Sequence, residues 1–191
     1  MSSTAASTES KIVILDRDGV INEDSDDYIK SLAEWVPIPG SIDAIARLSQ
    51  AGYTVVVASN QSGIARQLFD EFELARIHQT LCGLVESAGG TLHGIFYCPH
   101  GPEADCDCRK PAIGLLTRIE CEFGVSVQNA PFVGDSMKDL IAARLAGCRP
   151  VLVKTGKGLQ TQAEASENEL DGVDIFDDLA AFVDTFTGKA A

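Results

Sequence analysis

The sequence predicts an α/β domain with a Rossmann-like, doubly wound and mainly parallel sheet. Short β-branched runs alternate with longer helical patterns along the chain. This alternation is typical of parallel strands joined by right-handed helical crossovers. The chain has 191 residues, of which 45% are hydrophobic and 23% charged, which suits one domain with a buried core. We therefore expect a single domain over residues 11–188.

The expected elements follow one another in a regular order. Lys11–Leu15 is an uninterrupted apolar run, which favours a buried strand. Ser41–Ala51 has apolar residues at helical spacing, and Gly52 can end this helix. Thr54–Ala58 is the second strand. The later helices are expected over Phe72–Ser87, Ala112–Phe123, Lys138–Ala146 and Leu179–Phe186, and the later strands over Gly94–Cys98, Pro131–Val133, Pro150–Val153 and Val173–Phe176. No element is predicted for the polar stretch Gln160–Glu169.

The charge and the N-terminus exclude several classes of protein. The net charge of −13 argues against non-specific binding to nucleic acid or to anionic membranes, which needs a positive field. No apolar stretch approaches the roughly 18 residues of a membrane span. Residues 1–10 are small and polar, without the basic start and apolar run of a signal peptide. We expect a disordered leader there and a cytoplasmic protein, in which thiols stay reduced.

Polar residues that could bind a ligand or take part in catalysis follow several of the predicted strands. In a parallel sheet, ligands bind at the carboxyl ends of the strands, near a topological switch point. Each polar group alone has an ordinary interpretation as a helix cap, a turn or a solvated charge. Four such groups at one sheet edge indicate a site. They are Asp16-Arg17-Asp18-Gly19, Ser59-Asn60-Gln61-Ser62-Gly63, Arg109-Lys110-Pro111, and Gly134-Asp135 with Asp139.

These residue types fit phosphoryl transfer. Asp16 as nucleophile would form an aspartyl-phosphate and so divide one difficult displacement into two. Asp18 would protonate the leaving alcohol and then activate water. The hydroxyl of Ser59 and nearby backbone N–H groups would bind phosphate oxygens, and Lys110 would neutralise charge. Asp16, Asp18 and Asp135 would supply the hard oxygen ligands that Mg²⁺ prefers.

A cysteine cluster predicts a second metal. Cys98, His100, Cys106 and Cys108 match the Cys₃His type of closed structural zinc site. Four protein ligands leave no open position, so zinc would fix the loop 98–108, which runs directly into Arg109 and Lys110. The alternative is a group of incidental or redox thiols.

The other cysteines and histidines receive ordinary assignments. His93 is a competing zinc ligand, but it lies on the approach to a strand, and His100 is preferred. His78 is expected on a helix surface. The remaining cysteines are expected to be packing residues; these are Cys82, Cys121 and Cys148.

The four groups together resemble the motifs of the haloacid dehalogenase (HAD) superfamily. The residues that carry the resemblance are Ile14–Val20, Ser59, Lys110, and Gly134-Asp135 with Asp139, and the agreement runs from about residue 12 to 154. The resemblance implies that Asp18 lends its backbone carbonyl to Mg²⁺. Cap domains of this superfamily are inserted between motifs, but the intervals here of 41 and 51 positions leave no room for one. An open site shaped by loops is expected.

With the zinc loop, the chain is similar to the histidinol-phosphatase-like family, and within it to the phosphatases of sugar bisphosphates. This resemblance implies a Mg²⁺-dependent monomer that removes the 7-phosphate of D-glycero-D-manno-heptose 1,7-bisphosphate, in ADP-heptose and lipopolysaccharide-core synthesis. It also implies contacts to sugar hydroxyls, to the transferred phosphate and to the distal phosphate. The implied contact residues are Asp24, Asp27, Ser59, Asn60, Gln61, Ser62, Arg66, Arg109 and Lys110.

Two alternatives stay open at this point. The same domain occurs in phosphatases of histidinol phosphate, so another small phosphorylated metabolite would fit the same chemistry. A receiver-type phospho-acceptor module also forms an aspartyl-phosphate. In a receiver, however, the phosphorylated Asp follows the third strand, and a zinc loop has no place there.

Overall fold

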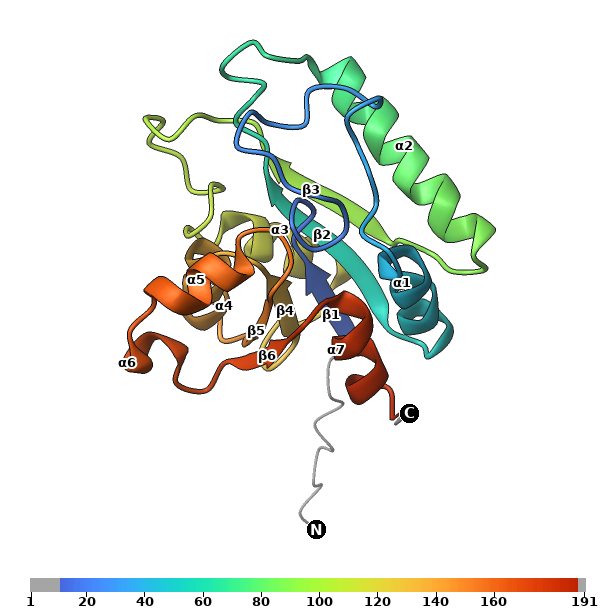
Figure 1. The fold of residues 1–191 in the computed structure, drawn as a ribbon, viewed down its shortest axis with the longest axis vertical. Coiled ribbons are helices and arrows are strands. Elements are labelled where there is room, and N and C mark those ends of the chain that lie inside the picture. Colours follow the sequence, from blue (N-terminus) through green and yellow to red (C-terminus); the bar gives the residue numbers. More distant parts are fainter. Residues whose placement is uncertain (1–10, 189–191) are drawn as a thin grey trace.

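The strands in the computed structural model form one parallel sheet, shown in Figure 1. The structure describes residues 11–188. Within them, six strands lie in the order β3-β2-β1-β4-β5-β6, and all neighbouring strands are parallel. Their bounds are β1 Ile12–Leu15, β2 Thr54–Asn60, β3 Gly94–Cys98, β4 Pro131–Gly134, β5 Arg149–Val153 and β6 Asp174–Phe176. The predicted doubly wound α/β fold is confirmed.

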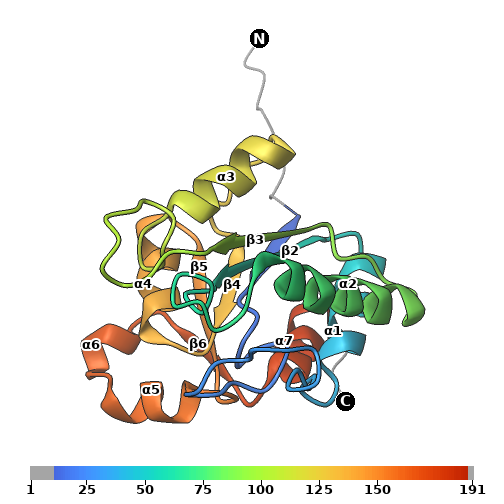
Figure 2. The same ribbon diagram turned by 90° about the horizontal axis from the view of Figure 1, so that it is seen from above.

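Helices cover both faces of the sheet, which is why the buried parts of the central strands are mainly apolar. In β1, Val13 and Leu15 pack into one core with α1, α2 and α7, whereas Ile12 and Ile14 pack into a second core with α3 and α4. Figure 2 shows α3 on the opposite side of the sheet from α1 and α7. The helices of residues 11–188 are α1 Ser41–Gln50, α2 Glu71–Ser87, α3 Gly114–Phe123, α4 Met137–Leu145, α5 Gly158–Glu164, α6 Glu167–Leu170 and α7 Leu179–Phe186.

Two helices lie in the polar stretch for which none was predicted. Only Gly158 is buried in α5 and no residue is buried in α6, so neither helix has the apolar periodicity that indicates a helix from sequence. Ser166 and Glu169 form a capping box at the start of α6. The expectation of a stretch without elements over Gln160–Glu169 is therefore wrong.

The chain reverses its direction of winding at β1. The strands proceed from β1 to β3 on one side, and β4 then pairs with the other edge of β1. The carboxyl ends of β1 and β4 therefore flank a topological switch point, where ligands bind in such sheets. Long loops rise above this edge (Figure 1). The expected leader over residues 1–10 lies outside the described residues, and none of the helices described is both long and apolar enough to cross a bilayer.

Candidate active site

A buried lysine joins two carboxylates at the switch point. Asp16 follows β1 directly, and its backbone N–H donates to the carbonyl of Val133 in β4 at 2.8 Å. The Nζ of Lys110 lies 2.9 Å from Asp16 Oδ2 and 2.6 Å from Asp139 Oδ1, and the Lys110 side chain is 2% exposed. A cation is thereby fixed beside the oxygen expected to attack phosphorus.

Burial and charge act in opposite directions on this trio. Burial raises the pKa of Asp16 to about 7, although the Lys110 ammonium opposes this shift. Burial alone would lower the pKa of Lys110, but the charges of Asp139 and Asp16 raise it above its ordinary value. Lys110 therefore stays charged and can neutralise a nucleophile and a phosphate.

Three carboxylates converge beside the lysine. Asp16, Asp135 and Asp139 each place one oxygen so that all three lie within 4.8 Å of one another. Burial, and then the charges of Asp139 and Asp16, raise the pKa of Asp135 to about 8. Hard oxygen atoms that repel one another in a buried place suit Mg²⁺. The side chain of Asp139 belongs to this cluster and that of Asp18 does not; the ligand expected from Asp18 is its backbone carbonyl.

Two glycines leave room for the carboxylate of Asp135. A Cβ atom on Gly19 would lie 2.0 Å from Asp135 Oδ2, and one on Gly156 would lie 2.2 Å from the same oxygen. Both glycines have positive φ angles, 79° and 56°. The backbone N–H of Lys157 donates to this Oδ2 at 2.8 Å. Only glycine fits at the two positions.

The carboxylate of Asp18 is held by Arg17 and Asn22, to which the sequence assigned no role, and by Gln61, which was expected to contact the substrate. Arg17, only 1% exposed, donates from Nη2 to both Asp18 oxygens at 2.9 and 3.1 Å. Asn22 Nδ2 and Gln61 Nε2 also donate to Asp18, at 2.9 and 2.8 Å. Burial alone would raise the pKa of Asp18, but Arg17, Asn22 and Gln61 hold it below its ordinary value. The only sequence signal for Arg17 was its place between the two aspartates.

The end of β2 and Gln61 after it support this arrangement through hydrogen bonds of their side chains. Asn60 makes two bonds to the backbone of Lys110, accepting from its N–H at 3.0 Å and donating to its carbonyl at 3.0 Å. Gln61 Nε2 also donates to Ser59 Oγ at 2.9 Å. Because the oxygen of Ser59 accepts this bond, its O–H is the group that can donate to a phosphate. Ser62 is buried at the same edge.

A helix packs behind the loop of Arg17. His78, in α2, is half-buried, and its Nε2 lies 3.5 Å from Arg17 Nη1. His78 was expected on a helix surface, but the loop after β1 covers this side of α2 and leaves the side chain only partly exposed.

The converging side chains line an open cleft of about 410 Å³. Of the residues expected to bind substrate, Asp27 and Arg66 do not line it, and the guanidinium of Arg66 lies 5.8 Å from the ring centre of Tyr28. Two lysines that were not predicted do line it, Lys138 and Lys157. The predicted residues that line it are Asp16, Asp18, Asp24, Ser59, Asn60, Gln61, Ser62, Arg109, Lys110 and Asp135.

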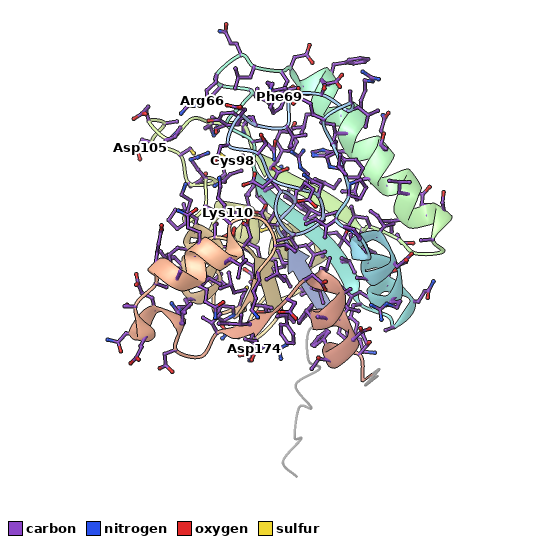
Figure 3. All side chains as sticks on the ribbon, viewed as in Figure 1. Arg66, Phe69, Cys98, Asp105, Lys110 and Asp174 are labelled. Atoms are coloured by element: carbon purple, nitrogen blue, oxygen red, sulfur yellow. The ribbon has the colours of Figure 1, made fainter. Side chains whose placement is uncertain are left out.

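The cysteine cluster forms beside the cleft, in the loop that connects Cys98 to Lys110 in Figure 3. Cys98 Sγ lies 3.3 Å from Cys108 Sγ and 3.8 Å from Cys106 Sγ, and His100 Nδ1 lies 3.3 Å from Cys108 Sγ. Zinc with bonds of about 2.3 Å to sulfur needs S···S separations of about 3.8 Å in a tetrahedron. The four residues therefore fit zinc. Burial and the adjacent thiols raise the pKa of Cys108 to about 12, and a bound metal would stabilise its thiolate.

His93, Arg109 and the cysteines outside the loop have other surroundings. His93 is engaged elsewhere, because its Nδ1 accepts from the N–H of Val55 at 3.1 Å. Arg109 donates from Nη1 to the His100 carbonyl at 3.2 Å, which ties it to the loop. Cys148 is buried and Cys82 half-buried, as expected of packing residues, but Cys121 is exposed and its assignment is wrong.

Known proteins resemble this chain over nearly all of its length. A family model described as HAD-hydrolase-like matches residues 107–182. The D-glycero-beta-D-manno-heptose-1,7-bisphosphate 7-phosphatase of Pseudomonas aeruginosa is 58% identical over 89% of this chain and 94% of its own, and that of Bordetella bronchiseptica is 48% identical over 94% and 99%.

A solved structure gives the same result in three dimensions. The D,D-heptose 1,7-bisphosphate phosphatase of B. bronchiseptica, complexed with magnesium and phosphate, superposes with a TM-score of 0.88 at 47% identity. The match covers 94% of this chain and 99% of the other.

Proposed function

Because the chain belongs to the D-glycero-beta-D-manno-heptose-1,7-bisphosphate 7-phosphatase family of the HAD-like hydrolases, we propose that it removes the 7-phosphate of this sugar bisphosphate. The observation that carries the proposal is the buried contact of 2.9 Å between Asp16 Oδ2 and Lys110 Nζ. It puts a carboxylate nucleophile and a fixed cation at one end of an open cleft.

The first step is attack by a carboxylate oxygen of Asp16 on phosphorus. The phosphorus–oxygen bond to the sugar breaks, and an aspartyl-phosphate forms. Lys110 reduces the repulsion between two anions, because its ammonium is already fixed beside Asp16 and has no water to shed. Ser59 donates its O–H to a phosphate oxygen.

Asp18 acts as the general acid and then as the general base. As the substrate enters, like-charge repulsion by its phosphate raises the pKa of Asp18 and favours uptake of one proton from solvent. Asp18 donates this proton to the leaving alkoxide, and the resulting carboxylate accepts a proton from the water that hydrolyses the aspartyl-phosphate. Its position is fixed by Arg17, Asn22 and Gln61.

The cleft contains cations for a second phosphate. Arg109 and Lys157 lie along its lining, together with Lys138. Asp24 also lines the cleft and can accept from sugar hydroxyls. In our proposal Arg109 takes the distal phosphate, because a planar guanidinium binds phosphate with two parallel bonds.

Two metals fit the side chains described. Asp16, Asp135 and Asp139 would hold Mg²⁺, with the backbone carbonyl of Asp18 as the family resemblance implies; bound Mg²⁺ polarises the phosphoryl group and offsets its charge. Cys98, His100, Cys106 and Cys108 would hold a structural zinc ion. The proposal extends to a monomeric enzyme of cytoplasmic ADP-heptose and lipopolysaccharide-core synthesis.

The test compares substrates and nucleophile variants. Phosphate release is measured from both anomers of heptose 1,7-bisphosphate and from histidinol phosphate, with Mg²⁺ present. We expect the heptose bisphosphate to have the highest kcat/KM, and Asp16→Asn to abolish turnover because an amide is not a nucleophile toward phosphorus. Asp43→Asn, at an exposed position of α1, is the matched control. Preference for histidinol phosphate would reject the substrate, and an active Asp16→Asn would reject the mechanism.

A further inference from the structure

Arg17 is a buried charged group whose every side-chain nitrogen has a partner. Its side chain is 1% exposed, Nε and Nη2 donate to Asp18, and Nη2 also donates to Gln61 Oε1 at 3.1 Å. Within residues 11–188, Nη1 has one side-chain partner, the Nε2 of His78 at 3.5 Å. A buried guanidinium without a partner for one nitrogen would be costly, and it would turn toward another acceptor.

The imidazole of His78 is suited to this position only in its neutral form. Nη1 is a donor, so Nε2 must be the acceptor and the ring proton must be on Nδ1. The ring packs against Tyr97, with 5.7 Å between ring centres and an interplanar angle of 59°. Burial and the Arg17 charge lower the pKa of His78 to about 4, in agreement with a neutral acceptor. α2 thus fixes the far end of the Arg17 side chain.

We propose that His78 is a positioning residue, which fixes Arg17 and through it orients the Asp18 carboxylate for proton transfer. The inference rests on the proposed function, in which Asp18 is the acid and base. His78 does not line the cleft, so it acts without contact to substrate. The chain of contacts runs from α2 through Arg17 to Asp18, and it explains why a charged side chain is tolerated in the interior.

The leaving group provides a readout that loss of folding cannot imitate. A sugar alkoxide needs a proton as it leaves, whereas the phenolate of p-nitrophenyl phosphate leaves without one. Misplacing Asp18 should therefore lower kcat/KM for the sugar phosphate much more than for the aryl phosphate. A merely structural loss would lower both by the same factor, because both substrates use the same Asp16, Lys110 and metal.

Two substitutions separate the acceptor from the bulk of the ring. His78→Leu removes the acceptor, and His78→Gln keeps an oxygen that can reach the place of Nε2; both are compatible with a helix. We expect His78→Leu to lose about tenfold or more in kcat/KM on heptose 1,7-bisphosphate and less than about threefold on p-nitrophenyl phosphate, a part of the 10²–10⁴ that positioned proton transfer contributes. His78→Gln should recover most of the loss.

Two references make the outcomes distinguishable. His93→Leu removes a histidine acceptor remote from the cleft and should leave the ratio of the two kcat/KM values unchanged. Asp18→Asn should show the largest change in that ratio. Suppose that Asp18→Asn changes the ratio, but that His78→Leu lowers kcat/KM equally on both substrates or on neither. His78 is then not a positioning residue, and the proposed function stands. If Asp18→Asn itself leaves the ratio unchanged, the assignment of Asp18 fails, and the inference fails with it.

Discussion

Replacing Asn60 by alanine separates two roles that the sequence did not distinguish. The family resemblance places Asn60 at the substrate, but in the structure both polar atoms of its side chain bond to the backbone of Lys110 at 3.0 Å. Asn60→Ala removes both bonds. It also releases the segment that carries the buried ammonium between Asp16 and Asp139.

The magnitude follows from the two lost bonds. Each neutral hydrogen bond contributes about 0.5–1.5 kcal/mol net, so the free energy of unfolding should fall by about 2 kcal/mol. In a chain of this size that corresponds to a decrease in Tm of about 4–8 °C. We expect kcat to fall about tenfold, because a small displacement of a group beside the reacting atoms is costly. KM should change little, since no substrate contact is lost.

Urea unfolding without substrate and steady-state kinetics on the bisphosphate measure both effects. The matched control is Asn168→Ala, in the exposed helix α6, which should alter neither quantity. An Asn60→Ala variant with unchanged stability and a strongly raised KM would refute the reasoning. Asn60 would then be a substrate-binding residue.

Three further predictions concern zinc, the distal phosphate and acid stability. Protein purified without added zinc should contain one zinc ion per chain by elemental analysis. Cys106→Ser should lose the ion and some activity without altering the Mg²⁺ requirement. A metal-free preparation with full activity would contradict this prediction. Arg109→Ala should lower kcat/KM much more for a bisphosphate than for a monophosphate of similar size, whereas equal losses would assign Arg109 to support of the loop alone. Burial lowers the pKa of His78 to about 4 in the folded chain. As pH falls, His78 therefore binds a proton in the unfolded chain before it does so in the folded chain, and the free energy of unfolding should fall between about pH 6.5 and pH 4. The total is at most about 3 kcal/mol; His78→Gln should show a shallower decline in urea titrations over this window, and an identical decline would contradict the assigned burial.

The sheet was predictable because its buried strands are short apolar runs that recur between helical patterns. Strands with both faces buried have uninterrupted apolar runs, as in β1, whose four residues are all buried. The edge strand β3 is mostly half-buried, yet Gly94–Cys98 has the same bounds in sequence and structure. The polar groups that follow β1, β2 and β4 lie at one edge for the same topological reason. α5 and α6 escaped prediction because they pack almost no apolar surface.

The contacts between side chains were less predictable, because they depend on which segments meet. Sequence spacing puts His78 on the polar side of α2, yet the loop of Arg17 covers it. Asn60 and Gln61 have amides that suit a sugar equally well, and only the position of Lys110 and Asp18 decides where they bond. Asp139 fits a helix cap by sequence and does cap α4 with Ser136, but its other oxygen meets Lys110.

The close approach of Gly19 and Gly156 to Asp135 has a consequence for anyone who wishes to move this chemistry to another scaffold. Copying the carboxylates and the lysine would not reproduce the site, because the space around Asp135 Oδ2 is defined by two stretches of main chain that carry no Cβ. A donor sequence aligned by its charged residues alone would introduce methyl groups into the volume that the carboxylate occupies. The portable unit is therefore two loops with their backbone conformation, and a library that varies catalytic side chains should hold both glycines constant.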